Sequence, residues 1–153
     1  MSGPATVAIA LGSNLGDRAA HLEHAIARLR DVLDGLRASR FYETVPVAMR
    51  GPQSLFLNAA VVGDASGTAR ELLGVLLGIE LERGRARPRV NAARTLDLDL
   101  ILFGGATIVE PGLVVPHPRF RERRFVLAPL AEIAPDLRDP VTGLSVSGLL
   151  AAL

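Results

Sequence analysis

The chain has 153 residues, 49% of them hydrophobic, and a formal net charge of +1, so it is long enough for one domain, which we take to span residues 1–153. It contains no cysteine and all 17 basic residues are arginine, which excludes disulfides, zinc–thiolate sites and any mechanism that needs a lysine. Because the charge is near zero, the apolar runs are short and no signal-peptide pattern is present, we expect a cytoplasmic protein that binds neither nucleic acid nor membrane.

The N-terminal segment predicts a strand followed by a helix. Residues 5–11 form a short apolar run of the length of a buried strand. Asp17 is placed to cap a helix, and apolar residues recur at helical spacing from Leu22 to Leu33. Gly35 is expected to end this helix.

Two strands and a second helix are predicted next. The strands cover residues 37–43 and 55–62, and the loop between them, residues 44–54, is of functional length. Thr68 and Glu71 have the spacing of a capping box, which predicts the start of a helix.

The C-terminal half begins with an arginine-rich loop over residues 84–93 and a strand that ends near Phe103. A hairpin is expected through residues 107–109 and a helix over residues 120–134, interrupted at Pro129. A short helix is expected from Ser145.

The order of these elements predicts an α+β fold. The order β-α-β-β-α-β is that of a ferredoxin-like βαββαβ core, with an antiparallel sheet and helices packed on one face. A C-terminal hairpin and helices are expected to follow this core.

The strand that begins after Arg94 has an unusual polar pattern. Apolar and polar residues alternate, so Asp97 and Asp99 share one face while Leu96, Leu98 and Leu100 face the core. Asp is disfavoured in strands, and two carboxylates on one face repel each other unless a positive charge lies between them. Carboxylates without His or Cys suit a hard cation such as Mg²⁺, although a solvated strand face is the simpler alternative.

Two arginine clusters flank these carboxylates. Five arginines lie between residues 83 and 94, and four more lie between residues 117 and 125. Each cluster by itself is equally consistent with phosphate binding and with a solubilising loop, and an RNA-binding patch is a third option. Arginines beside a carboxylate pair are typical of a site for a nucleoside triphosphate with Mg²⁺.

Three further residues are candidates for ligand contacts. His117 lies between two prolines, and its neutral ring could donate a hydrogen bond to phosphate, although a lone histidine is more often structural. Phe56 and Asn58 share one face of a strand, so the ring could stack on a flat ligand while the amide binds its edge. A core Phe and an edge Asn are the structural alternative.

Taken together, these segments resemble the hydroxymethyl-dihydropterin pyrophosphokinase family of folate biosynthesis. The matching motifs run almost from end to end and include residues 11–17 (LGSNLGD), 41–46 (FYETVP), 56–60 (FLNAA), 94–100 (RTLDLDL), 115–119 (VPHPR) and 125–130 (FVLAPL). One departure is that Val90-Asn91-Ala92-Ala93 stands where the family often has Arg-Trp-Gly-Pro.

The resemblance implies transfer of pyrophosphate from ATP to the hydroxymethyl group of 6-hydroxymethyl-7,8-dihydropterin, with release of AMP. It implies two Mg²⁺ ions held by Asp97 and Asp99, and ATP as co-substrate. Catalysis would rest on positioning and charge neutralisation, and we expect a monomer that acts on small molecules.

The resemblance also implies a role for each matching residue. The catalytic set is Arg85, Arg87, Asp97 and Asp99. The ATP-binding set is Glu80, Arg85, Arg87, Arg94, Leu100, His117 and Arg123. The pterin-binding set is Thr44, Val45, Pro46, Val47, Phe56, Asn58 and Phe125.

Two alternatives remain at this point. One is a non-catalytic ferredoxin-like module that binds a nucleotide or RNA, although the aromatic RNP pattern of RNA-binding sheets is absent from the sequence. The other is a family relative that has lost activity through its altered loop.

Overall fold

A computed structural model describes residues 4–45, 55–84 and 95–153. Its main sheet has strands β1 (Ala5–Ser13), β2 (Leu33–Ala38), β3 (Tyr42–Thr44), β4 (Phe56–Ala65) and β5 (Asp97–Phe103). The spatial order is β2-β4-β1-β5, β3 pairs with β4 as well, and all pairs are antiparallel. This is the strand order of a ferredoxin-like core, which confirms the predicted fold class.

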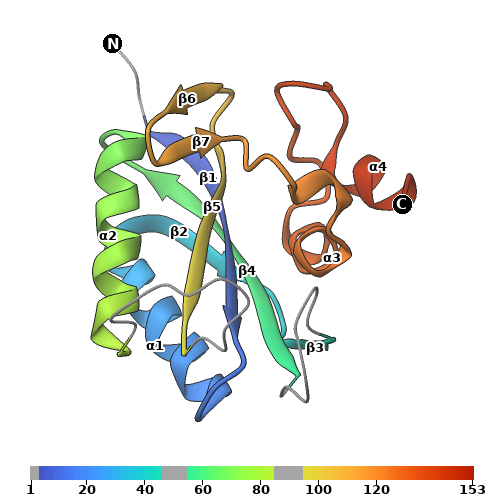
Figure 1. Ribbon diagram of the computed structural model, residues 1–153. Helices are drawn as coiled ribbons and strands as arrows, with labels where there is room; N and C mark the ends of the chain where they lie inside the picture. Colours follow the sequence, from blue (N-terminus) through green and yellow to red (C-terminus); the bar gives the residue numbers. More distant parts are fainter. Residues whose placement is uncertain (1–3, 46–54, 85–94) are drawn as a thin grey trace.

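Helices cover both faces of this sheet (Figure 1). Helices α1 (Arg18–Arg30) and α2 (Ala69–Glu82) lie on one face, and α3 (Arg124–Ile133) and α4 (Val146–Ala151) lie on the other. The two helices of the core thus share one face, as the element order predicts, and the C-terminal helices cover the other. The second face is covered because β1 and β4 are apolar on both sides: Ala8, Ala60 and Val62 are buried together with residues of α3.

Side-chain alternation divides the core into two clusters. Val7, Ile9 and Leu11 of β1 pack with residues of α1 and α2, while Ala8 packs with α3 and with the fully buried Phe120. At the end where β1 finishes and β5 begins, the second face carries polar rather than apolar side chains. The polar side chains at this end include Asn58 of β4 and Asp97 and Asp99 of β5.

The first helix is shorter than predicted. Asp17 caps α1 by accepting a hydrogen bond from the Ala20 amide at 3.1 Å, but the helix ends at Arg30 and Leu33 already begins β2. Leu33 is buried in the same core as Leu29, so it continues the helical spacing without being helical. Gly35, with φ of 62°, lies at a register shift within β2 rather than at the end of the helix.

The predicted strand over residues 37–43 is two strands, β2 and β3. Both pair with β4, and the chain between them is fixed by Ser39, whose amide donates to the Ala60 carbonyl at 2.9 Å. The predicted capping box is present: the Thr68 hydroxyl accepts from the Glu71 amide at 3.1 Å, and the Glu71 carboxylate accepts from the Thr68 amide at 2.8 Å.

The C-terminal half differs from the prediction at two places. The hairpin forms between β6 (Ile108–Glu110) and β7 (Leu113–Val115), because Pro111-Gly112 makes the turn and Gly112 has φ of 74°. The predicted helix over residues 120–134 breaks after the 3₁₀ helix η1 (Phe120–Glu122), and α3 continues through Pro129. None of the described helices is long and apolar enough to cross a membrane.

Candidate functional site

The two strand carboxylates lie side by side at the start of β5. Asp97 and Asp99 are half-buried, whereas Leu98 and Leu100 between and beyond them are buried against α1 and α2. Two residues of a strand advance by about 6.7 Å. The carboxylates are thus close enough to act on one ligand, on the polar end of the second face.

Glu80 fixes the position of this strand from the opposite face. It lies in α2, only 4% of its surface is exposed, and its carboxylate accepts the backbone hydrogen bond of Leu98 at 2.7 Å. β5 is at the edge of the sheet formed by the described strands, and this contact satisfies the Leu98 amide there. Leu98 lies between the two aspartates, so Glu80 holds the backbone that carries them.

A row of paired residues joins Asp97 to Asn58 across three strands. Gly12 of β1 pairs with Asp97 on one side and with Asn58 of β4 on the other, so the two side chains are separated by two strand spacings, about 10 Å. A Cβ atom at Gly12 would lie 3.2 Å from Asn58 Nδ2 and 3.7 Å from Phe56 Cδ1. Gly12 therefore leaves room for the Asn58 amide and the Phe56 ring, which lie next to it on this face.

The amide end of this row is held by β3. Thr44 donates its hydroxyl hydrogen bond to Asn58 Oδ1, and Asn58 is 6% exposed. Thr44 also pairs with Phe56 in the β3–β4 ladder. Thr44, Phe56 and Asn58, which the sequence predicts to share a site, thus lie together on one face.

His117 lies beside the carboxylates. Its backbone amide donates to the Ile101 carbonyl of β5 at 3.0 Å, and its Nδ1 accepts from the Arg119 amide at 3.2 Å. Burial of the ring lowers the pKa of His117, as does Arg123, whereas the nearby Asp97 raises it. The ring is therefore neutral at pH 7, and with Nδ1 as acceptor the proton is on Nε2, which can donate to a ligand.

Arg123 and Phe125 follow on the same segment of the chain, residues 117–125, which we call the arm. Arg123 is the residue that precedes α3, and its guanidinium lies 5.5 Å from the centre of the half-buried Phe125 ring. Arg123 and Asp97 both affect the pKa of His117, in opposite directions. The arm thus brings a cation, a neutral imidazole and an aromatic ring to one place.

Not every predicted residue is located by the structure. Pro46, Val47, Arg85, Arg87 and Arg94 lie outside the described residues. Val45 is 76% exposed at the end of β3. The Leu100 side chain is buried in the α1–α2 core, so it faces away from the carboxylates.

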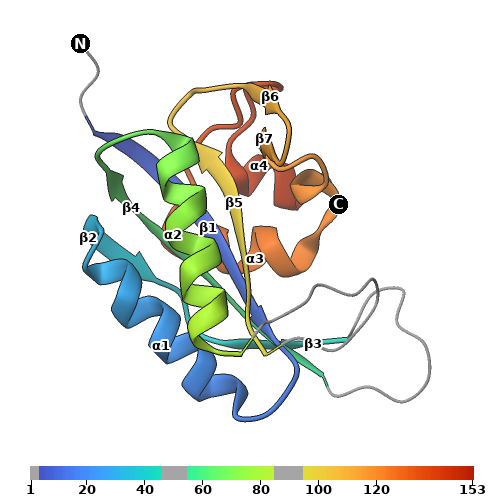
Figure 2. The same cartoon turned by 60° about the vertical axis from the view of Figure 1, so that its left-hand side comes forward.

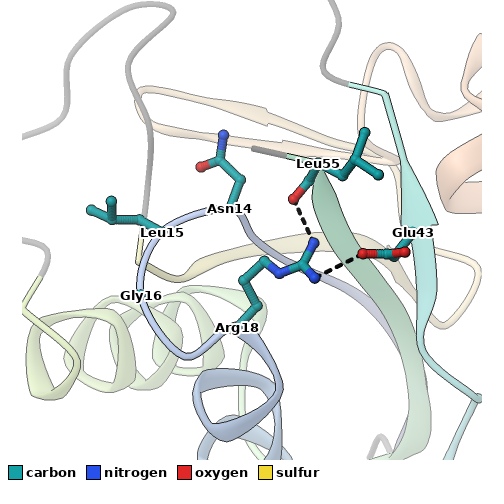
Figure 3. Close-up of a pocket in the computed structure, with 6 residues that line it drawn as sticks. All are labelled: Asn14, Leu15, Gly16, Arg18, Glu43 and Leu55. Atoms are coloured by element: carbon teal, nitrogen blue, oxygen red, sulfur yellow. Dashed lines mark hydrogen bonds and ion pairs between the residues drawn. The ribbon is translucent and has the colours of Figure 1, made fainter. Parts of the chain in front are cut away.

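A pocket of about 350 Å³ opens next to this site, on the α1 side (Figure 3). Arg18 crosses it, donating to the Leu55 carbonyl at 2.7 Å and pairing with Glu43 at 2.8 Å. The remaining lining residues are Asn14, Leu15 and Gly16. Among the described residues that line this pocket, none belongs to the predicted site. Arg18 ties α1 to the strand ends that carry Thr44 and Phe56.

Gly12 is a residue that sequence reasoning misses, whereas Glu80 belongs to the ATP-binding set that the resemblance implies. The importance of Gly12 depends on its register with Asp97 and Asn58, and register across strands far apart in sequence is not visible in a sequence. A polar residue within the apolar face of a helix is a visible signal for Glu80, because a buried carboxylate needs a donor.

Comparison with known proteins gives a consistent result. The sequence model of the 7,8-dihydro-6-hydroxymethylpterin-pyrophosphokinase (HPPK) family matches residues 8–135. The chain is 45% identical over 136 residues to a 2-amino-4-hydroxy-6-hydroxymethyldihydropteridine pyrophosphokinase of Bacillus subtilis (strain 168), covering 88% of this chain and 81% of that protein. It is 44% identical over 151 residues to the protein of that name from Methylorubrum extorquens, covering 92% and 94% respectively.

Solved structures agree on the fold. A Plasmodium falciparum HPPK-DHPS chain superposes with a TM-score of 0.80 at 16% sequence identity, covering 99% of this chain and 46% of that one. This chain thus spans about half the length of that solved structure. With a family match over most of its length and two relatives above 40% identity, the chain belongs to the 7,8-dihydro-6-hydroxymethylpterin-pyrophosphokinase family.

Proposed function

We propose that this protein transfers pyrophosphate from ATP to the hydroxymethyl group of 6-hydroxymethyl-7,8-dihydropterin, with release of AMP, in folate biosynthesis. Family membership supports this activity. The observation that carries it in the structure is the row Asp97–Gly12–Asn58. In this register the carboxylates of Asp97 and Asp99 face the same side of the sheet as the Asn58 amide and the Phe56 ring.

Mg²⁺ is the ion that the carboxylate end fits. Among the described residues no three His, Cys, Asp or Glu side chains gather as a metal site, whereas Mg²⁺ typically takes one or two carboxylates together with substrate phosphates. Asp97 and Asp99 supply such a pair of hard oxygen donors, and we infer that they hold two ions with ATP. When bound, Mg²⁺ neutralises charge on the triphosphate.

The phosphates of ATP have donors on the arm that carries His117. Nε2 of the neutral ring donates a hydrogen bond, and the Arg123 guanidinium supplies charge and a planar fork that matches phosphate oxygens. Arg85, Arg87 and Arg94 are proposed as further phosphate contacts on the strength of their place in the sequence alone.

The pterin is proposed to bind at the Asn58 end of this row. Asn58 can both donate and accept hydrogen bonds at the polar edge of the ring, and Thr44 fixes the orientation of this amide. Phe56 and Phe125 offer ring faces for stacking. The sequence adds the backbone of residues 45–47 to this set.

The reaction then needs geometry more than reactive side chains. The hydroxymethyl oxygen attacks the β-phosphorus in line, the new O–P bond forms as the bridge to the α-phosphate breaks, and the hydroxyl proton is released. His117 and Arg123 hold the transferred group, and Asn58 and Phe56 hold the pterin that receives it. Such positioning lowers the barrier by fixing both substrates before reaction.

We also propose that residues 1–153 act as one domain and as a monomer. The sheet is covered on both faces by helices of the same chain, so the fold needs no partner to bury its core. Elution at the size of a single chain in gel filtration, unchanged by dilution, is the expected result.

The decisive experiment measures AMP by chromatography with ATP, Mg²⁺ and 6-hydroxymethyl-7,8-dihydropterin. AMP is expected only when both substrates are present, and chelation of Mg²⁺ should abolish its formation. The double variant Asp97→Asn/Asp99→Asn should lower kcat at least a thousandfold, because it removes the charges that hold the metal. Formation of AMP by this variant at the wild-type rate would refute the assignment of the site.

Asp64→Asn is the matched control for this double variant. Asp64 lies at the far end of the same sheet, where it accepts a hydrogen bond from the Thr6 hydroxyl at 2.9 Å. Activity within twofold of wild type is expected. A protein that binds ATP or RNA but forms no AMP with any pterin would instead be a binding module or an inactive relative.

A further inference from the structure

A buried ion pair outside the proposed site holds the chain segment that carries His117, Arg123 and Phe125. Asp139 lies in the loop before α4, and its side chain is 0% exposed. Its carboxylate accepts two hydrogen bonds from Arg121, from Nε at 2.5 Å and from Nη2 at 2.9 Å. This forked geometry fixes the direction of the guanidinium as well as its distance.

The Asp139 carboxylate accepts two further hydrogen bonds from its own loop. Asp139 accepts from the Val141 amide at 3.0 Å and from the Thr142 hydroxyl at 2.7 Å. The loop is closed on itself, because the Asp139 amide donates to the Leu144 carbonyl at 2.9 Å and the Gly143 amide donates to the Asp139 carbonyl at 2.8 Å. Asp139 is thus a rigid acceptor, fully satisfied and shielded from water.

Arg121 lies in the short segment that carries the site residues His117, Arg123 and Phe125. His117 is tied to β5 through the Ile101 carbonyl, Phe120 is fully buried in the second core, and Arg121 is tied to Asp139. Arg123 and Phe125 follow directly. The Arg121 guanidinium also lies 4.8 Å from the centre of the Phe120 ring, so both anchors act on the same turn.

We propose that Asp139, acting through Arg121, is a positioning residue for the phosphate and pterin contacts of Arg123 and Phe125. This inference rests on the proposed function of those two residues. A buried ion pair is costly to desolvate and seldom adds net stability over an apolar pair. Its value here is directional: it fixes η1 and thereby the start of α3.

The test compares Asp139→Asn with Thr142→Ala. Asn keeps the size of the side chain but turns an amide N–H₂ or a single oxygen towards the guanidinium, so the fork is lost. Thr142→Ala removes one other hydrogen bond to the same carboxylate and leaves the ion pair intact, so it is the matched control. Thermal unfolding of both variants and the wild type is recorded first, and kinetics are measured well below the lower midpoint.

The expected result is a difference in KM, which a loss of folded protein cannot produce. Asp139→Asn should raise the KM for ATP at least fivefold, whereas Thr142→Ala should leave it within twofold of wild type even where its midpoint falls. An unchanged KM for ATP in Asp139→Asn, with only kcat reduced in proportion to the folded fraction, overturns the proposal. If Asp139→Asn does not fold, Arg121→Lys keeps the charge without the fork and should raise the same KM.

Hydrogen exchange supplies a readout that does not depend on catalysis. Amides of residues 120–127 should exchange faster in Asp139→Asn than in Thr142→Ala. Equal exchange in the two variants overturns the proposal. A wild type that forms no AMP with the pterin refutes the proposed function, while the exchange data still decide whether Asp139 holds this segment.

Discussion

At the scale of single residues, the site depends on Gly12, which has no side chain. Gly12 has ordinary strand conformation, so its value does not come from backbone freedom. It comes from the Asn58 amide, with which a Cβ at this position would make a tight contact of 3.2 Å. The absence of a side chain at Gly12 therefore decides where the Asn58 amide can lie.

Replacing Gly12 by Ala is expected to weaken pterin binding. The new Cβ would lie 3.2 Å from Asn58 Nδ2, so the amide that Thr44 orients must move by a few tenths of an ångström. We expect the KM for the pterin to rise at least tenfold while the KM for ATP changes less than threefold. Steady-state kinetics with each substrate varied in turn make the measurement.

Gly74→Ala is the control for this change. Gly74 lies within α2, and a Cβ there meets no atom within 4 Å, so kinetic constants should stay unchanged. Stability should rise by about 0.5–1 kcal/mol, because Ala is the better helix former. An equal rise in both KM values in Gly12→Ala would contradict a specific effect on the pterin end.

His117 predicts a dependence of stability on pH. Its pKa in the folded protein lies below the unfolded value, mainly because the ring is buried, so the unfolded chain binds the proton more readily. The stability that the neutral His117 ring contributes is therefore fully present above about pH 6.5, and it declines as the pH falls below this value. His117→Gln, which keeps an N–H donor near the position of Nε2, lacks this titration.

Thermal midpoints of wild type and His117→Gln between pH 8 and pH 5 test this point. The wild type is expected to lose stability relative to the variant as the pH falls. His21, whose pKa is also lowered, is present in both proteins and cancels in the difference. Parallel curves over this range would show that His117 does not titrate differently in the two states.

At the scale of elements, the sequence predicts those whose own residues decide them. The capping box at Thr68 is local chemistry, and α2 begins where it predicts. The alternation around Asp97 is likewise local, and β5 presents both carboxylates on one face. The C-terminal helix after Ser145 is a third case, with the Ser145 hydroxyl accepting from the Gly148 amide at 3.1 Å.

Elements decided by distant contacts are predicted less well. Leu33 fits the helical spacing of α1 but pairs with Ala65 in the sheet. The arm after His117 breaks at Arg123 rather than at Pro129 because Phe120 and Arg121 are held by the core and by Asp139. The site follows the same rule: its residue types are visible in the sequence, while the register that aligns them is a property of the sheet.

Glu80 links an element to the site in a way that kinetics can test. The resemblance implies a contact of Glu80 with ATP, whereas the structure gives its carboxylate a bond to the Leu98 amide at 2.7 Å. Glu80→Gln keeps a carbonyl oxygen as acceptor, so stability and the KM for ATP should stay near wild type. Glu80→Ala leaves a buried amide unpaired, which should cost about 1–3 kcal/mol.

The comparison of these two variants separates the roles. If Glu80 acts through β5, Glu80→Ala should raise the KM for ATP and lower the denaturant midpoint together, and Glu80→Gln should change neither. A large rise in KM with Glu80→Gln at unchanged stability would instead favour a direct contact between the carboxylate and ATP.

At the scale of the whole molecule, the two hydrophobic clusters lie on opposite faces of the sheet and are covered by different kinds of contact. The α1–α2 side is closed by apolar helix faces and by an exposed ion-pair cluster in which Glu82 accepts from Arg28 and His24. The α3–α4 side is closed by the loop that buries Asp139. The site lies on the second side, so its integrity depends on a charged contact rather than on apolar packing alone.

This difference predicts how the molecule unfolds in acid. The hydrogen bond from Arg121 holds the pKa of Asp139 well below its usual range, so the unfolded state takes up the proton first. The stability that this carboxylate contributes is therefore complete above about pH 5 and is lost as the pH falls below the unfolded pKa of about 3.9. Wild type should unfold steeply in this window, whereas Asp139→Asn should be less stable at pH 7 and depend less on pH below 5.

Urea unfolding at pH 7, 5, 4 and 3, followed by circular dichroism, gives the stability at pH 7 and its dependence on pH. Asp64→Asn is the control because Asp64 has an exposed hydrogen bond to Thr6. Equal pH dependence in all three proteins would mean that other carboxylates drive acid unfolding; a dependence lost only in Asp139→Asn would show that the buried ion pair beside the site is the acid-sensitive contact of the fold.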